Sequence, residues 1–303
     1  MRVILGGIYK LLLGFENRFD RMGRIGLGNA VKGDFLYFGK MIENIRTMTH
    51  ISPRLFLLSL MCLCFCGSIQ AQITNLVVLN DAEIIRLRAL LATDSQVKAY
   101  QDSLLSLAET ALRQPPRPLA VIQYEGLLDT DLRRVETVKS FEDVDHMVHL
   151  IYASYCRDNP AYGKKARQLV LSWAKTYVPD GNPINENKLT AFLWGYHLFR
   201  DQFRKKEKQL VEAWMRAIAT KEINRERTPN NNWEAKRLKL AGTIGCLVED
   251  ETLKNYAVEG FKTYISTAYF PDGTSNDLRQ RDALHYHLSG ITPCLATFIN
   301  LSP

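Results

Sequence analysis

The sequence predicts an all-α protein built from helical hairpins, as in an α/α toroid or solenoid. From Asp81 onward, apolar residues recur with the period of a helix. Segments rich in proline, glycine and asparagine separate these periodic stretches. Sustained two-residue alternation with β-branched residues is missing, apart from short stretches at 77–79 and 119–122. Because the stripes keep no heptad register, stacked hairpins fit the pattern better than a coiled coil.

The segment 141–157 shows the helical pattern most plainly. Its apolar stripe recurs every three or four residues: Phe141, Val144, Val148, Ile151 and Tyr155. Similar stripes predict helices at about 81–93, 97–113, 160–177, 187–203, 205–223, 231–248, 250–270 and 278–299. The breakers between them lie at 115–118, 179–183, 228–230 and 271–273. We therefore expect about nine helices in one domain, since no linker-like change of composition interrupts the series.

The composition is that of a soluble globular protein and gives no sign of nucleic-acid binding. The chain has 303 residues, of which 46% are hydrophobic and 23% charged. The net charge of +7 is concentrated at the start, because residues 1–54 hold nine basic and four acidic residues. The remainder has 30 basic and 28 acidic residues, too even a balance to attract a phosphate backbone.

The first 71 residues have the features of a targeting segment. Residues 55–69 form an apolar run that follows Arg54 and is followed by small residues up to Ala71. The run is shorter than the ~20 residues of a spanning helix and suits a signal peptide, with a retained membrane anchor as the alternative. We predict a start at Met48, a signal peptide over 48–71, an upstream or non-native extension over 1–47, and a mature domain over 72–303. The mature protein would be secreted or periplasmic, with no stable membrane anchor after cleavage.

The mature region offers no metal site and no disulfide framework. It holds three widely spaced cysteines, Cys156, Cys246 and Cys294. An odd set at such spacing fits neither a disulfide scaffold nor a zinc site. We expect no metal and no cofactor.

Three groups of motifs resemble the alginate-lyase-like polysaccharide lyases over about residues 80–303. They are the helix pair at 150–173, the Asn-Asn-Trp turn at 229–233, and the Pro-Asp-Gly-Thr-Ser and Arg-Asp-Ala-Leu-His-Tyr-His segments at 271–275 and 281–287. The resemblance implies an α/α toroid, an incomplete barrel of helical hairpins. It also implies β-elimination on uronic-acid polysaccharides of the alginate or glucuronan type, without a redox cofactor. Some relatives carry a His after the Asn-Trp pair, where this chain has Asn232 or Lys236 nearby. Relatives continue with further helices beyond the position of Pro303, so the resemblance implies a C-terminally truncated member.

β-Elimination dictates which side chains the site needs. The proton on C5 of a uronate becomes acidic only when the neighbouring carboxylate is neutralised and the developing enolate is stabilised. Asn, His and Arg donate directed hydrogen bonds for this task, and Tyr or His serves as base and acid. The catalytic candidates are Asn232, Arg281, His285, Tyr286 and His287. The substrate-binding candidates are Asn231, Trp233, Arg279, Trp194 and His197.

The second cluster depends on whether its segment is helical. In a helix beginning near Asp277, Arg281 and His285 are neighbours on one face, and Leu284 and Leu288 point to the core. In an irregular segment, His287 becomes the better candidate. The alternatives to a site are helix-capping asparagines at 231–232 and a solvated charged helix at 281–287.

Three functions therefore stay open. The first is a lyase acting on an acidic polysaccharide. The second is a toroidal glycoside hydrolase that uses two carboxylates. The third is a non-catalytic or truncated carbohydrate-binding relative. An unsaturated product separates the first from the second, because hydrolysis creates no double bond.

Overall fold

The computed structural model describes residue 79 and residues 81–226, 230–281 and 284–301, with only the backbone described for 81, 281 and 294–301. These residues all lie within one compact unit, 71–303. The predicted extension at 1–47 and the predicted signal peptide at 48–71 lie outside the described residues.

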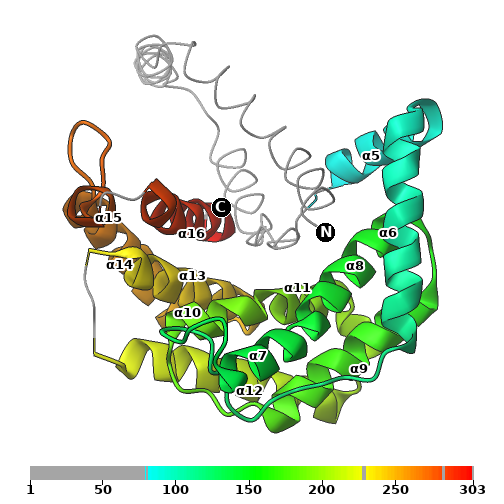
Figure 1. The fold of residues 1–303 in the computed structure, drawn as a ribbon, viewed down its shortest axis with the longest axis horizontal. Coiled ribbons are helices and arrows are strands. Elements are labelled where there is room, and N and C mark those ends of the chain that lie inside the picture. The colour runs from blue at the N-terminus through cyan, green and yellow to red at the C-terminus, as the bar shows by residue number, and fades with distance from the viewer. Residues whose placement is uncertain (1–78, 80, 227–229, 282–283, 302–303) are drawn as a thin grey trace, which may run out of the picture. The chain divides into compact units, whose positions relative to one another are not determined.

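The described part of the chain is helical (Figure 1). Its first helices are α5 (Asp81–Thr93), α6 (Ser95–Arg113), α7 (Leu132–Ser140), α8 (Glu142–Cys156), α9 (Pro160–Thr176), α10 (Pro183–Glu186) and the 3-10 turn η1 (Asn187–Leu189). The later ones are α11 (Thr190–Leu198), the 3-10 turn η2 (Arg200–Gln202), α12 (Lys205–Asn224), α13 (Asn232–Leu247), α14 (Glu251–Ala268), α15 (Asn276–Arg281) and α16 (Leu284–Leu301). Within these ranges, the one β-type pairing is an isolated bridge between Tyr269 and Ser275.

Most predicted helices are confirmed, with three differences. Helix α7 was not predicted, because its buried residues, Thr137 and Ser140, are polar and leave no apolar stripe. The expected helix at 187–203 is divided into η1, α11 and η2. The expected helix at 278–299 corresponds to two described helices, α15 and α16.

The helices pack as hairpins in two layers, and Figure 1 shows successive hairpins side by side from α6 to α16. Helices α8, α11, α13 and α16 form the first layer, in which each contacts the next. Helices α9, α12 and α14 back this layer: α9 packs on α8, α11 and α12, while α12 and α14 both pack on α13. The predicted all-α architecture of helical hairpins is thus confirmed, and α13 has neighbours from both layers.

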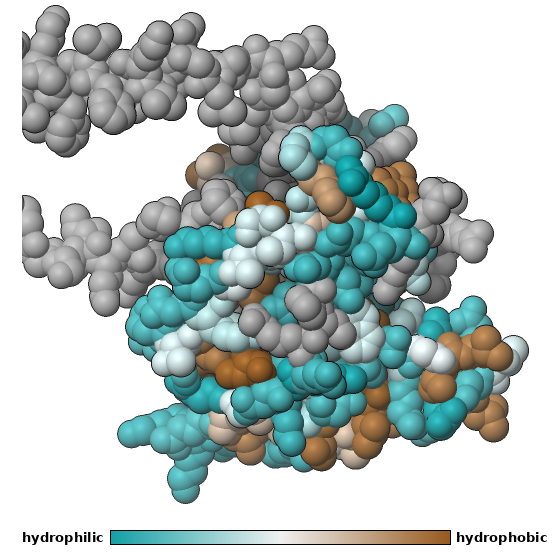
Figure 2. Space-filling model, turned by 90° about the vertical axis from the view of Figure 1, so that its left-hand side faces the viewer, coloured by the Kyte–Doolittle hydropathy of each residue, from teal (hydrophilic) through white to brown (hydrophobic). Residues whose placement is uncertain are grey.

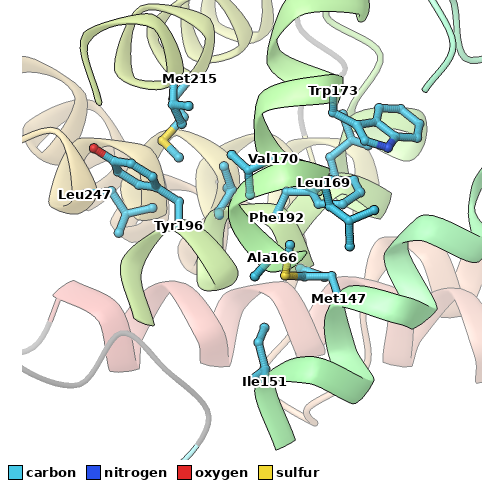
Figure 3. Packing of buried hydrophobic residues seen from close by; sticks show 14 of the residues in the cluster. Met147, Ile151, Ala166, Leu169, Val170, Trp173, Phe192, Tyr196, Met215 and Leu247 are labelled. Atoms are coloured by element: carbon cyan, nitrogen blue, oxygen red, sulfur yellow. The ribbon is translucent and has the colours of Figure 1, made fainter. Parts of the chain in front are cut away.

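The main hydrophobic core lies between these layers (Figure 3). Met147 of α8, Trp173 of α9 and Phe192 of α11 are fully buried there, and the Trp173 and Phe192 rings have centroids 5.2 Å apart. The indole N–H of Trp173 donates to Asp143 Oδ2 at 2.8 Å, so the one polar atom of this ring is satisfied. Gly195 of α11 lies against the Met147 side chain, which brings α8 and α11 close together.

A buried charge cluster fixes α13 to α12. Arg237 of α13 is 0% exposed, and its guanidinium bonds the Glu234 carboxylate at 2.5 Å. Its Nε lies 3.9 Å from Oε2 of Glu222 on α12. Burial, and then the neighbouring Glu186 carboxyl, raise the pKa of Glu222 far above its ordinary range, so this side chain is neutral at pH 7. Glu186 in turn accepts hydrogen bonds from Tyr177 Oη and from two backbone amides.

The surface on the α14–α15 side is mostly hydrophilic, with apolar side chains scattered singly or in small groups (Figure 2). Such scattering is ordinary for a protein surface. Among the helices of the described ranges, none combines the length and the apolar character needed to cross a bilayer.

Candidate active site

At the start of α13, two adjacent asparagines have different roles, which the sequence alone does not distinguish. Asn231 is the N-cap, because its side chain accepts a hydrogen bond from the Trp233 amide at 3.0 Å. Asn232 is the first helical residue, and its backbone N–H donates to Asp277 Oδ2 at 2.7 Å. The capping interpretation therefore applies to Asn231. The Asp277 carboxylate already occupies the positive end of the helix, which leaves the Asn232 side chain for another role.

The side chain of Asn232 points to α16. It is 4% exposed, and its Nδ2 donates to Ser289 Oγ at 3.3 Å. Its Oδ1 is buried and has no hydrogen-bond partner among the described residues. One turn further along α13, the Lys236 ammonium donates to the same Ser289 oxygen at 2.6 Å. The Ser289 hydroxyl on α16 thus accepts hydrogen bonds from both the Asn232 amide and the Lys236 ammonium of α13.

Ser289 also shares its helix face with two of the predicted catalytic residues. His285 and Tyr286 lie four and three residues before it, so all three lie on one side of α16. His285 is exposed, Tyr286 is half-buried, and their ring centroids are 3.9 Å apart. The structure therefore places the Asn232 turn beside the helix face that carries His285 and Tyr286.

His287 lies on the other side of α16. Its Nδ1 is 2.9 Å from Ser275 Oγ, and its ring meets Tyr269 edge-on with centroids 6.1 Å apart. Ser275 is buried and also accepts a hydrogen bond from the Leu278 amide. His287 thus ties α16 to the start of α15 instead of facing Asn232. The expectation that Leu284 and Leu288 point to the core is wrong, because they are 62% and 49% exposed.

Positive charge gathers next to Asn232. Asn187 Nδ2 donates to the Lys236 carbonyl at 3.1 Å, which brings η1, with Lys188, against α13. Burial and the charge of Lys188 lower the pKa of Lys236 to about 8, against the opposing effect of Asp277. Burial and the charge of Lys236 lower the pKa of Lys239 to about 8 as well. Such a row of cations suits a polyanionic ligand.

Arg279 and Trp233 are engaged in contacts outside this cluster. The Arg279 guanidinium bonds Asp272 Oδ2 and Thr274 Oγ1, each at 2.7 Å, and lies 3.5 Å over the Phe270 ring. Arg279 is therefore held on the turn that precedes α15, where Gly273 has a φ of 82°. Trp233 lies on the side of α12, with the Arg225 guanidinium carbon 5.4 Å from its ring centroid.

The remaining candidates lie on neighbouring elements. Trp194 and His197 are half-buried on α11, one turn apart, and Trp194 packs against the main core. Arg281 is the last residue of α15, and its side chain lies outside the description. In the parts of the chain that are described, no three His, Cys, Asp or Glu residues are arranged to hold a metal ion.

Sequence reasoning missed Ser289, the residue on which this arrangement converges. It also did not predict that Asp277 of α15 accepts the backbone N–H of Asn232 at the start of α13. The i, i+4 spacing of Asn232 and Lys236 predicts a shared face, and the same spacing joins His285 to Ser289. Lys236 and Ser289, which join the two faces, are 53 residues apart in the sequence. A local sequence pattern does not reveal such a contact.

The fold and the site define a class: an all-helical protein that sets an amide, an imidazole and a phenol beside a row of lysines. The sequence profile of the family described as alginate lyase matches residues 92–297. The chain belongs to this alginate lyase family and is a polysaccharide lyase.

Solved structures of alginate lyases share the fold. Alginate lyase A1-III from Sphingomonas species A1 has a TM-score of 0.57 at 14% identity, with 76% of this chain and 70% of that chain covered. A histidine-to-alanine variant of alginate lyase A1-III, complexed with a tetrasaccharide, has a TM-score of 0.56 at 16% identity, with 76% and 69% covered. Among curated proteins, no sequence matches this chain significantly.

Proposed function

We propose that the chain cleaves a uronic-acid polysaccharide of the alginate or glucuronan type by β-elimination at the contact between α13 and α16. The observation that carries this proposal is the meeting of Asn232 and Lys236 at Ser289, on the face of α16 that bears His285 and Tyr286. The solved relative whose variant is complexed with a tetrasaccharide supports a saccharide ligand.

The chemistry assigns a role to each group. The Asn232 amide donates to the uronate carboxylate as it gains enolate character. His285 and Tyr286, with rings 3.9 Å apart, supply the base and the acid. As the base takes the C5 proton, the C5–H electron pair forms the C4–C5 double bond. The C4–O bond breaks, its electron pair stays on the leaving oxygen, and the acid protonates that oxygen.

Four other predicted residues receive supporting roles. Arg281, at the end of α15, is assigned to the same carboxylate as a further cation. His287 is assigned a positioning role, since it holds α16 against Ser275. Trp194 and His197 are assigned to sugar binding, because aromatic faces stack on pyranose rings. We further propose that the protein is secreted or periplasmic, on the strength of the apolar run at 55–69.

The test is product analysis on polymannuronate, polyguluronate and polyglucuronate. A lyase releases oligosaccharides that carry an unsaturated uronate, seen by ultraviolet absorbance and by a mass lower by one water than a hydrolysis product. New reducing ends without the unsaturated sugar would contradict the proposal. Binding without any product would support the non-catalytic alternative.

A further inference from the structure

Among the described residues, the ammonium of Lys236 is held at the site by a hydrogen bond and not by an ion pair. It donates to Ser289 Oγ at 2.6 Å, and Asn232 Nδ2 donates to the same oxygen at 3.3 Å. Both donors therefore converge on one oxygen of α16. Lys236 is one helical turn from Asn232, so the two side chains share a face of α13.

The surroundings of Lys236 are mostly of like charge. Lys188 of η1 and Lys239 of α13 face it as cations, while Asp277 of α15 is a carboxylate that acts on it. On the Ser289 face, α16 adds His285 and Tyr286. Asp277 accepts the Asn232 backbone N–H. Within the described ranges, no carboxylate lies within ion-pair distance of Lys236. A half-buried cation without a counter-ion is costly, and an arriving anion relieves that cost.

We propose that Lys236 is the cation that neutralises the uronate carboxylate of the sugar that loses its C5 proton, with Ser289 as its positioning residue. This inference rests on the proposed lyase function and names the contact that makes it selective for acidic sugars. Lys236 changes no covalent bond during the reaction. Its charge stabilises the negative charge that spreads onto the carboxylate when C5 loses its proton, and Asn232 donates alongside it.

The position also explains why an amide and a lysine are found together. A lysine ammonium is a compact point charge with three donors, so it can keep the Ser289 hydrogen bond and still bind a carboxylate. An amide adds direction without charge. The pair thus supplies the neutralisation and the orientation that elimination requires.

The decisive experiment compares an oligouronate with its methyl ester. Esterification removes the ground-state charge of the carboxylate, while negative charge still develops on the ester oxygen as C5 loses its proton. A variant without the cation should therefore lose more activity on the free acid than on the ester. Lys236→Met is expected to lower kcat/KM on the free acid by about 100-fold or more, the scale of losing one charge-stabilising donor. On the ester the loss in kcat/KM should be clearly smaller, because only the developing charge then depends on Lys236. Lys236→Arg should keep part of the free-acid activity.

The control is Lys262→Met, because Lys262 lies on α14 and forms an exposed ion pair with Glu259. It should match the wild type on both substrates. Circular dichroism melting establishes that Lys236→Met is folded. Equal losses on acid and ester, or no loss on the acid, would overturn the assignment of Lys236.

Calorimetric titration with the free-acid oligouronate separates this inference from the proposed function. If the wild type binds the oligouronate and releases no unsaturated product, the lyase proposal fails. In the same titration, Lys236→Met should weaken binding about tenfold or more, as expected for a lost charge-assisted hydrogen bond. Unchanged affinity in that variant would overturn the Lys236 contact whatever the activity.

Discussion

Replacing Arg237 by methionine is expected to destabilise the protein by about 3–5 kcal/mol, the cost of breaking a buried ion pair by removing one partner. Arg237 is 0% exposed and bonds Glu234 at 2.5 Å and the Glu226 carbonyl at 3.3 Å. Methionine fills much of the volume and removes the charge. The cost falls on Glu234, which is 5% exposed and loses its close cation. For a domain of this size, each kcal/mol shifts Tm by about 2–4 °C, so a fall of roughly 6–20 °C is expected.

Urea titration and thermal melting, both followed by circular dichroism, measure this loss. The matched control is Lys262→Met, which removes a cation from a pair whose side chains are 65% and 70% exposed. An exposed pair contributes about 0–1 kcal/mol, so the control should melt within a few degrees of the wild type. A loss below about 1 kcal/mol for Arg237→Met would contradict this expectation, because removing the guanidinium from the buried Glu234 carboxylate would then cost little.

Three further predictions follow from the packing and charges. Burial raises the pKa of Glu222 above its ordinary value of 4.5, so the folded state keeps a proton that the unfolded state releases, and stability should fall as pH rises above about 5. Glu222→Gln should weaken the pH dependence of stability in thermal melts between about pH 5 and pH 8. An unchanged dependence would show that another group causes it. Gly195→Ala should cost about 1–3 kcal/mol in urea titrations, because the new methyl would meet the Met147 sulfur; a neutral result would show that Met147 moves aside freely. Ser289→Ala should lower kcat on the oligouronate while Tm stays within a few degrees, and unchanged kcat would remove Ser289 from the site.

The helices were predictable because their apolar residues recur at helical spacing and their ends carry local signals. Asn159, followed by Pro160, begins α9 as expected from an N-cap and an N1 proline. Helix α7 was not predictable, because its buried Thr137 is polar and accepts a hydrogen bond from the Gln123 amide. A search for apolar periodicity does not count a buried polar residue.

The site was predictable in its parts and not in its assembly. The sequence identifies the Asn-Asn-Trp turn and the His-Tyr-His segment, but it does not say that Asn231 caps the helix while Asn232 reaches α16. It leaves open which histidine faces that turn, because the answer depends on where α16 begins. The hydroxyl of Ser289 joins the two segments, and serine alone is too common a residue to signal a site.

Asn232 and the His285 face of α16 are proposed to act on one uronate. The most direct test of this proposal is the rate of unsaturated-product release by Asn232→Ala, His285→Ala and the double variant, each shown by circular dichroism to be folded. Each single variant should lose about 100-fold or more, and the double variant should be little slower than the worse single one, as for groups that act as a unit. Turnover near the wild-type rate in either folded single variant would contradict the proposal.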